Sequence, residues 1–220
     1  RQRQICIRDS FSWAETNIDQ ILNNMACPID TRIPPIEPGK ESPEVHELYN
    51  LCLDMYGIVP KFIQVLAHAP GAARSFLVFD RDIKVASHRE GDTERSRMQV
   101  LCILKPSLDN SCHNCAHHNV ALARQLGFNE KQLSSISSNS WNQNNDFTEK
   151  EKLILDWANA VTDMSARDKN TLFTKMLKHF SHSEIVEFTY TPALWKCTNR
   201  LAEAMHITAE SKDKGINWET

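Results

Sequence analysis

Apolar residues recur at intervals of three and four along most of the chain, and this spacing limits the possible folds more than any other feature. Between Pro43 and Gly57 the apolar positions are Val45, Leu48, Leu51, Cys52 and Met55. Residues at such intervals share one face of an α-helix, whereas a half-buried strand needs an apolar residue at every second position. Because no alternating stretch of useful length occurs, we predict an all-α protein, a bundle of several helices.

The same spacing, together with capping residues, sets the expected helix positions. Thr148 with Glu151, and Ser181 with Glu184, form capping boxes. Prolines are expected to interrupt helices, so that one helix ends before Pro106 and the last is kinked at Pro192. The serine- and asparagine-rich residues 134–145 are expected to form a loop. The expected helices cover residues 12–25, 43–56, 62–68, 70–85, 93–104, 112–126, 148–161, 172–180 and 181–205.

The organisation along the chain follows from length and proline content. With 220 residues, 41% of them hydrophobic, the chain is long enough for one well-filled core. We expect an N-terminal helix and proline-rich arm over residues 1–42, a helical domain over 43–210 and a C-terminal tail over 211–220. Several helices are apolar over more than one narrow stripe, which predicts a homo-oligomer. The arm could cross to a neighbouring subunit.

Charge and cysteine content exclude several classes of protein. The net charge of −3 gives no reason to expect binding to nucleic acid or to an anionic membrane surface, and no apolar run is long enough to cross a membrane. The N-terminal residues lack the apolar region of a secretory signal. The seven cysteines are an odd number and are mostly scattered singly, which favours a reducing compartment over a disulfide framework. We therefore expect a cytoplasmic protein.

Residues 111–118, with the sequence SCHNCAHH, carry the chemistry. Cys112, Cys115 and His118 are three residues apart, so a helix beginning here places them near one face. The positive end of a helix favours a thiolate, and a nearby imidazole can take its proton. The spacing therefore predicts a reactive thiol pair.

Two other interpretations of this stretch remain open. Three possible ligands within seven residues could form part of a zinc site, although the fourth ligand has no evident source in the sequence. The two thiols could also be inert packing residues, because free cysteine is among the most buried residue types. The polar setting of the pair argues against packing alone.

The motif also resembles a known family. CHNCAHH, followed by an alanine-rich helix and Gly-Phe-Asn-Glu at 127–130, resembles the peroxidase-related, alkylhydroperoxidase D-like branch of the carboxymuconolactone decarboxylase superfamily. The likeness covers residues 45–207 and includes the segments 57–60, 68–70, 147–152 and 199–202. It implies an all-helical, oligomeric enzyme, an oxidoreductase that needs no bound cofactor or metal and reduces hydroperoxides through its cysteine pair.

The resemblance also implies roles for single residues. Cys115 would be the peroxidatic thiol, Cys112 the resolving thiol that closes the disulfide, and His118 the group that relays the proton. A thiolate attacks the peroxide to give a sulfenic acid, and the second thiol condenses with it. The implied partners are hydrogen peroxide or a small organic hydroperoxide, and a dithiol reductant that is either a lipoylated or a thioredoxin-like protein.

One expected residue is missing from its usual place. The family commonly carries a relay glutamate on the helix before the motif, but Val100 occupies that position and no acid occurs between Glu94 and Asp109. Three alternatives follow: Glu94 reaches in from a turn further back, the relay runs through water and His117, or the peroxidase activity is weak.

Two functions of other classes also fit the sequence. One is a lyase like carboxymuconolactone decarboxylase, in which a histidine transfers protons and the cysteines have no redox role. The other is a non-enzymatic, redox-sensing oligomer in which disulfide formation changes packing.

Overall fold

The computed structural model describes residues 17–26 and 31–210, and every regular element in that part of the chain is helical. This confirms the prediction of an all-α fold. The elements are α1 (Ile18–Met25), α2 (Pro43–Tyr56), α3 (Lys61–Leu66), α4 (Pro70–Phe79), η2 (Asp80–Val85), α5 (Ala86–Arg89), α6 (Thr93–Asp109), α7 (His113–Gln125), α8 (Glu130–Ser137), η3 (Trp141–Gln143), α9 (Glu149–Thr162), η4 (Ala166–Asp168), α10 (Asn170–His179) and α11 (His182–Ala204).

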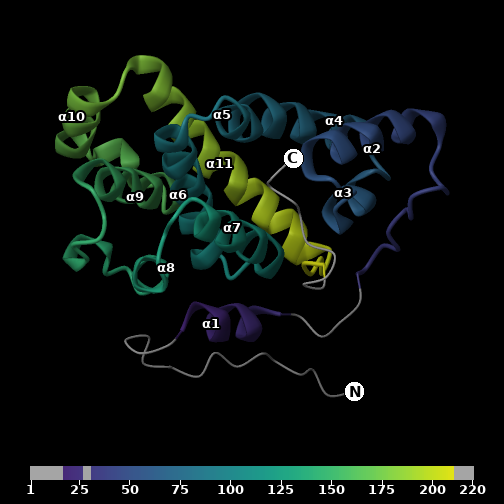
Figure 1. The fold of residues 1–220 in the computed structure, drawn as a ribbon, viewed down its shortest axis with the longest axis horizontal. Helices are drawn as coiled ribbons and strands as arrows, with labels where there is room; N and C mark the ends of the chain where they lie inside the picture. The colour runs from purple at the N-terminus through teal and green to yellow at the C-terminus, as the bar shows by residue number, and fades with distance from the viewer. Residues whose placement is uncertain (1–16, 27–30, 211–220) are drawn as a thin grey trace.

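Helix α6 is the centre of the bundle and packs against α7, α9 and α11. Every residue from Met98 to Leu108 is buried, so the helix is covered on all sides. Lys105 lies within this buried stretch because its ammonium group is held by Asp109, 2.5 Å away. Helices α2 to α4 lie at one end of the molecule and α9 and α10 at the other, with α6, α7 and α11 between them (Figure 1).

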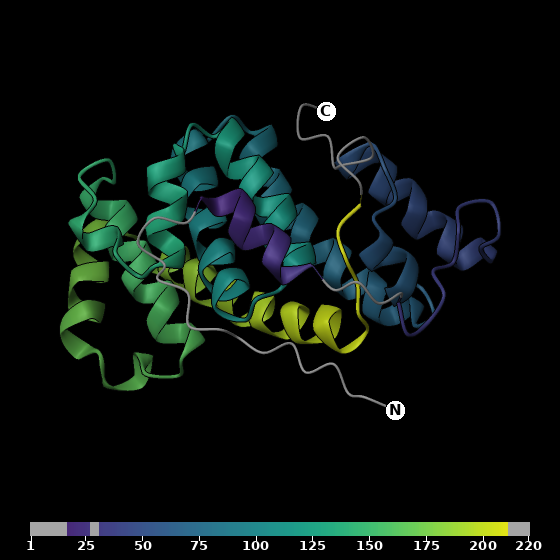
Figure 2. The same ribbon diagram turned by 90° about the horizontal axis from the view of Figure 1, so that it is seen from below.

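The chain after α11 returns across the bundle. Residues 205–210, which we call the C-terminal strap, pass between α7 and the α2–α4 group (Figure 2). Ile207 is buried in the strap, and the carbonyl of Met205 accepts a hydrogen bond from the backbone N–H of Arg32 at 3.1 Å. The strap brings Glu210 beside α3 and α7, which positions part of the site described below.

One predicted helix end is wrong because tertiary packing overrides proline. Helix α6 continues through Pro106 to Asp109. The proline removes one intrahelical hydrogen bond, but the buried surroundings of α6 leave the chain no better path. Helix α11 includes Pro192 within a single helix, in agreement with the long helix expected over 181–205. The predicted capping boxes at Thr148 and Ser181 are confirmed.

Two further segments differ from expectation. The predicted helix over 70–85 becomes π-helical at η2. The predicted loop over 134–145 begins only after α8, whose start is fixed by a capping box of Asn129 with Gln132. The residues before 17 in the expected first helix, and the expected tail 211–220, lie outside the described residues.

None of the helices in the described ranges combines the length and apolar character needed to cross a membrane.

Candidate thiol site

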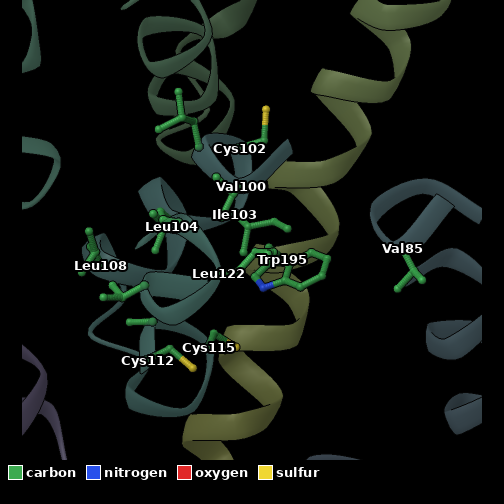
Figure 3. Close-up of a cluster of buried hydrophobic side chains, with 14 of the residues drawn as sticks. Val85, Val100, Cys102, Ile103, Leu104, Leu108, Cys112, Cys115, Leu122 and Trp195 are labelled. Atoms are coloured by element: carbon green, nitrogen blue, oxygen red, sulfur yellow. The ribbon is translucent and has the colours of Figure 1, made fainter. Parts of the chain in front are cut away.

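The cysteine pair lies at the N-terminus of α7, as the sequence predicts. Cys112 is the N-cap residue, and Cys115 lies one turn into the helix. Ser111 turns the chain with a left-handed φ of 52°, and the backbone N–H of Cys112 donates to the carbonyl of Ser107 at 2.9 Å. Both cysteines are free thiols, and both are buried. The tight turn after α6 therefore fixes the position of both sulfur atoms at the edge of the α6 core cluster (Figure 3).

The two thiols have unequal surroundings. A hydrogen bond between Cys112 and Cys115 raises the pKa of Cys112, and burial raises it further. Glu203, in the last turn of α11, interacts with Cys112 as well. Burial raises the pKa of Glu203, although hydrogen bonds from the Cys112 thiol and the His113 backbone N–H oppose that shift. Cys112 is therefore a protonated thiol with two neighbouring acceptors for its single proton, the Cys115 sulfur and the Glu203 carboxylate.

Cys115 opens onto a pocket with an empty volume of about 430 Å³, including its mouth. The walls come from α7 and α11 on one side and from the segment between α2 and η2 on the other. Apolar and aromatic residues form one part of the lining: Pro60, Phe62, Ile63, Phe76 and Trp195. Polar residues form the rest: Tyr56, Asp80, Lys84, Asn114, His118, Asn119 and Thr198. Cys112 is fully buried and is not part of the lining.

His118 lines this pocket and is paired with the C-terminal strap. Its Nε2 lies 2.6 Å from Oε2 of Glu210, and the other carboxylate oxygen of Glu210 accepts a hydrogen bond from the backbone N–H of Lys61. Burial acts to raise the pKa of Glu210, but the hydrogen bond and charge of His118, together with the N–H of Lys61, lower it overall. The imidazole is thus held in one orientation by an ionised carboxylate.

Glu94 is not brought to the cysteines. It lies in the first turn of α6, is 64% exposed, and pairs with Lys150 at 2.6 Å. At 1.5 Å per residue, it is about 22 Å along the helix from Asp109, whereas the cysteines follow the other end. The carboxylates that do reach the motif are Glu203 and Glu210, which lie far away in the sequence, where residue spacing gives no signal of their proximity.

A second group of buried charged residues lines the same pocket as Cys115. Lys84 and Asp80 are 7% and 1% exposed, and the Lys84 Nζ lies 3.4 Å from Asp80 Oδ2. The Tyr56 hydroxyl donates to the same oxygen. Burial lowers the pKa of Lys84, while Asp80 and Cys115 act in the opposite direction. Sequence reasoning missed these residues because they lie in segments with helical apolar spacing, where they resemble solvent-facing positions.

No group of three or more histidine, cysteine, aspartate or glutamate side chains in the described ranges is arranged to hold a metal ion. Cys112, Cys115 and His118 have other partners: each other, Glu203 and Glu210. The local geometry therefore gives no support to the zinc interpretation of the motif.

No protein-family model matches the sequence, and no curated protein matches it. Solved structures do match. A peroxidase-related protein from Ralstonia eutropha JMP134, described as an alkylhydroperoxidase AhpD core, has a TM-score of 0.68 at 18% identity, over 85% of this chain and 95% of that chain. A peroxidase-related protein from Silicibacter sp. TM1040 has a TM-score of 0.67 at 17% identity, over 86% and 99%.

The debrominase Bmp8 is a third similar structure, with a TM-score of 0.65 at 18% identity, over 83% of this chain and 94% of that chain. At identities this low, the similarity establishes the fold alone. All three alignments nevertheless span almost the whole of the matched chains and most of this one. The helical arrangement that holds the cysteine turn, the pocket and the central α6 helix is therefore the alkylhydroperoxidase D-like fold.

Proposed function

We propose that this protein is a thiol oxidoreductase that reduces small hydroperoxides through Cys115 and Cys112. The observation that carries the proposal is the unequal placement of the two thiols: Cys115 lines the pocket, whereas Cys112 is buried behind it and hydrogen-bonded to it. This is the arrangement that an attacking thiol and a resolving thiol need. The similar structures described as peroxidase-related are consistent with it.

In the proposed reaction, each ionisable group near the cysteine pair has one role. His118 takes the proton of Cys115, and the thiolate attacks the outer peroxide oxygen. The O–O bond breaks, the proton returns from His118 to the leaving oxygen as an alcohol or water, and Cys115 becomes a sulfenic acid. Cys112 then gives its proton to Glu203 and attacks the Cys115 sulfur, so that the disulfide forms as the S–O bond breaks. Glu203 returns the proton to the leaving hydroxide, which departs as water. A dithiol reductant, lipoylated or thioredoxin-like, restores the pair.

Reductive removal of a halogen from a small aromatic ring is a second candidate. Phe62, Phe76 and Trp195 line the pocket beside Cys115 and provide flat apolar walls suited to such a ring. Bmp8, which has the same fold, has been solved with 2,3,4-tribromopyrrole. Both candidates use Cys115 as the nucleophile and differ in the atom that it attacks.

Thiol counting after one equivalent of oxidant tests the main proposal. The fully reduced protein, mixed with hydrogen peroxide or with an organic hydroperoxide, is expected to lose two thiols and to form a Cys112–Cys115 disulfide, mapped by mass spectrometry. Cys115→Ser should lose this reaction, whereas Cys112→Ser should stop at a sulfenic acid that dimedone traps. Cys197→Ser, at an exposed cysteine, is the matched control and should react like the wild type.

Two results would contradict the proposal. Retention of all thiols with both peroxides would reject the redox role, and an unimpaired Cys115→Ser variant would remove Cys115 from it. Release of bromide from tribromopyrrole in the presence of dithiol, without any reaction with peroxide, would favour the second candidate instead.

A further inference from the structure

We propose that Lys84 is the counter-cation of the Cys115 thiolate, and that Asp80 and Tyr56 are positioning residues that hold its ammonium group at the pocket. This inference rests on the proposed function, in which Cys115 reacts as a thiolate. It adds a residue of η2 to a set of reacting groups otherwise supplied by α7, α11 and the C-terminal strap.

The placement of Lys84 supports this role. Lys84 of η2 and Cys115 of α7 line the same pocket and interact electrostatically. The ammonium group lies 5.3 Å from the ring centre of Trp195 and 6.0 Å from that of Tyr56, so aromatic faces surround it as well. Charges attract more strongly in such low-dielectric surroundings than in water, so a cation here stabilises an anionic sulfur effectively.

The local backbone explains how a buried lysine is kept there. Asp80 and Lys84 lie on the π-helical segment η2, and such widened turns occur often at functional sites. An unpaired buried ammonium would be costly, and Asp80 supplies the opposite charge at 3.4 Å. The Tyr56 hydroxyl fixes one oxygen of Asp80, while the other oxygen, Oδ1, is buried and has no hydrogen-bond partner in the described part of the chain. The cluster thus has a spare acceptor close to the place where a substrate would bind.

The cluster fits the charge movement of the proposed reaction. Negative charge forms on the Cys115 sulfur and moves to the leaving oxygen when the O–O bond breaks. Lys84 faces that region throughout and keeps its own proton, because His118 carries the proton between the sulfur and the leaving oxygen. Preorganised charge of this kind needs no rearrangement as the reaction proceeds.

The pH dependence of Cys115 reactivity tests the role of Lys84. The titratable groups that face Lys84 are Asp80 on its own element, Tyr56 on α2, and Cys115 and His118 on α7; α11 contributes Trp195 and Thr198, which do not titrate. The rate of Cys115 alkylation by iodoacetamide is measured against pH, with the product identified on the Cys115 peptide by mass spectrometry. This measurement requires no peroxide and no reductant.

The decisive variant is the double substitution Asp80→Asn with Lys84→Met, which removes the cation without leaving a buried carboxylate unpaired. Its alkylation midpoint should move to higher pH, with a rate at pH 7 lower by about tenfold or more. Lys84→Arg, which keeps the charge, should remain close to the wild type. Lys131→Met, at a lysine whose side chain is 72% exposed, is the matched control and should leave the profile unchanged.

An unchanged profile in a double variant that is folded by circular dichroism would overturn the proposal. If the double variant does not fold, Asp80→Asn alone decides, because it removes the carboxylate that holds the Lys84 ammonium group and leaves that cation buried without an opposite charge. Its midpoint should also move to higher pH, and an unmoved midpoint would equally overturn the proposal. The two proposals can fail separately. If the alkylation profile depends on Lys84 but the protein does not reduce peroxide, the proposed function is rejected and the role of Lys84 as counter-cation stands.

Discussion

Replacing Glu210 by glutamine should weaken both the fold and the site, because one carboxylate joins the C-terminal strap (residues 205–210) to two helices. It lies 2.6 Å from Nε2 of His118 and also accepts a hydrogen bond from the backbone N–H of Lys61. The side chains of Glu210 and His118 are only 11% and 9% exposed, so solvent screens the pair little. A hydrogen bond to a charged group contributes about 1.5–3 kcal/mol. We expect Glu210→Gln to lower the free energy of unfolding at pH 7 by about 2 kcal/mol.

The pH dependence of this loss has a definite sign. In the folded protein the pKa of Glu210 is held below its ordinary value of 4.5. The stabilisation is therefore fully present above that value and is lost as the pH falls through the lower pKa of the folded state. The difference between wild type and variant should be largest near pH 7 and should shrink in acid, because protonation of the wild-type carboxylate has the same effect as the substitution.

Urea unfolding followed by circular dichroism at pH 7 and again in acid measures both effects. A change of 1 kcal/mol in the free energy of unfolding shifts the melting temperature of a chain of this size by about 2–4 °C. In a thermal scan at pH 7 the melting temperature should therefore fall by about 4–8 °C. Glu149→Gln is the control, since that side chain is 90% exposed and its pair with Lys152 is long, at 4.0 Å; exposed pairs of this kind contribute little. Equal stability of Glu210→Gln and wild type at pH 7, or a difference that grows in acid, would refute the argument.

Two further substitutions test buried ionisable groups. Arg97→Met should lower the free energy of unfolding, measured in urea, by about 3–5 kcal/mol, because it leaves the buried carboxylate of Glu151 without its cation. Adding Glu151→Gln should recover part of this loss. If the losses of the two single variants simply add in the double variant, the pairing would be contradicted. His113→Gln should make stability less sensitive to pH between 7 and 5, because burial, with the charges of His117 and His118, lowers the pKa of His113 from 6.5 to about 4. On acidification the unfolded state binds a proton at His113 before the folded state does, so the wild type loses stability as the pH falls from 6.5 towards 4. Equal losses in the wild type and in His113→Gln would contradict the lowered pKa of His113.

Local patterns were reliable wherever a helix depends on its own residues. The capping boxes at Thr148 and Ser181 begin α9 and α11 as expected, because each side chain satisfies backbone groups three residues away. The glycine after Tyr56 ends α2 in a left-handed conformation for the same kind of local reason. The expectation failed at Pro106, where the lost hydrogen bond is a local cost and the burial of α6 is a long-range gain.

The candidate site also combines residues that local spacing predicts with residues that only the tertiary structure brings together. Cys112, Cys115 and His118 are close in sequence and lie on one helical turn after another, so their spacing alone was enough to single them out. Glu94 was the nearest acid along the chain, yet it points to Lys150 at the far end of α6. Linear distance could not reveal that a strap from the end of the chain would supply Glu210 instead.

By itself, the sequence determined the helical class, most helix starts and the thiol motif, because helix periodicity, capping and cysteine spacing act over three or four residues. Only the tertiary structure decided which thiol lines a pocket, which carboxylates reach the motif and that Lys84 shares the pocket with Cys115. Those relations depend on how α6 orients the helices packed around it and on where the chain returns after α11. They are set by packing among residues far apart in the chain, and residue spacing carries no information about such contacts.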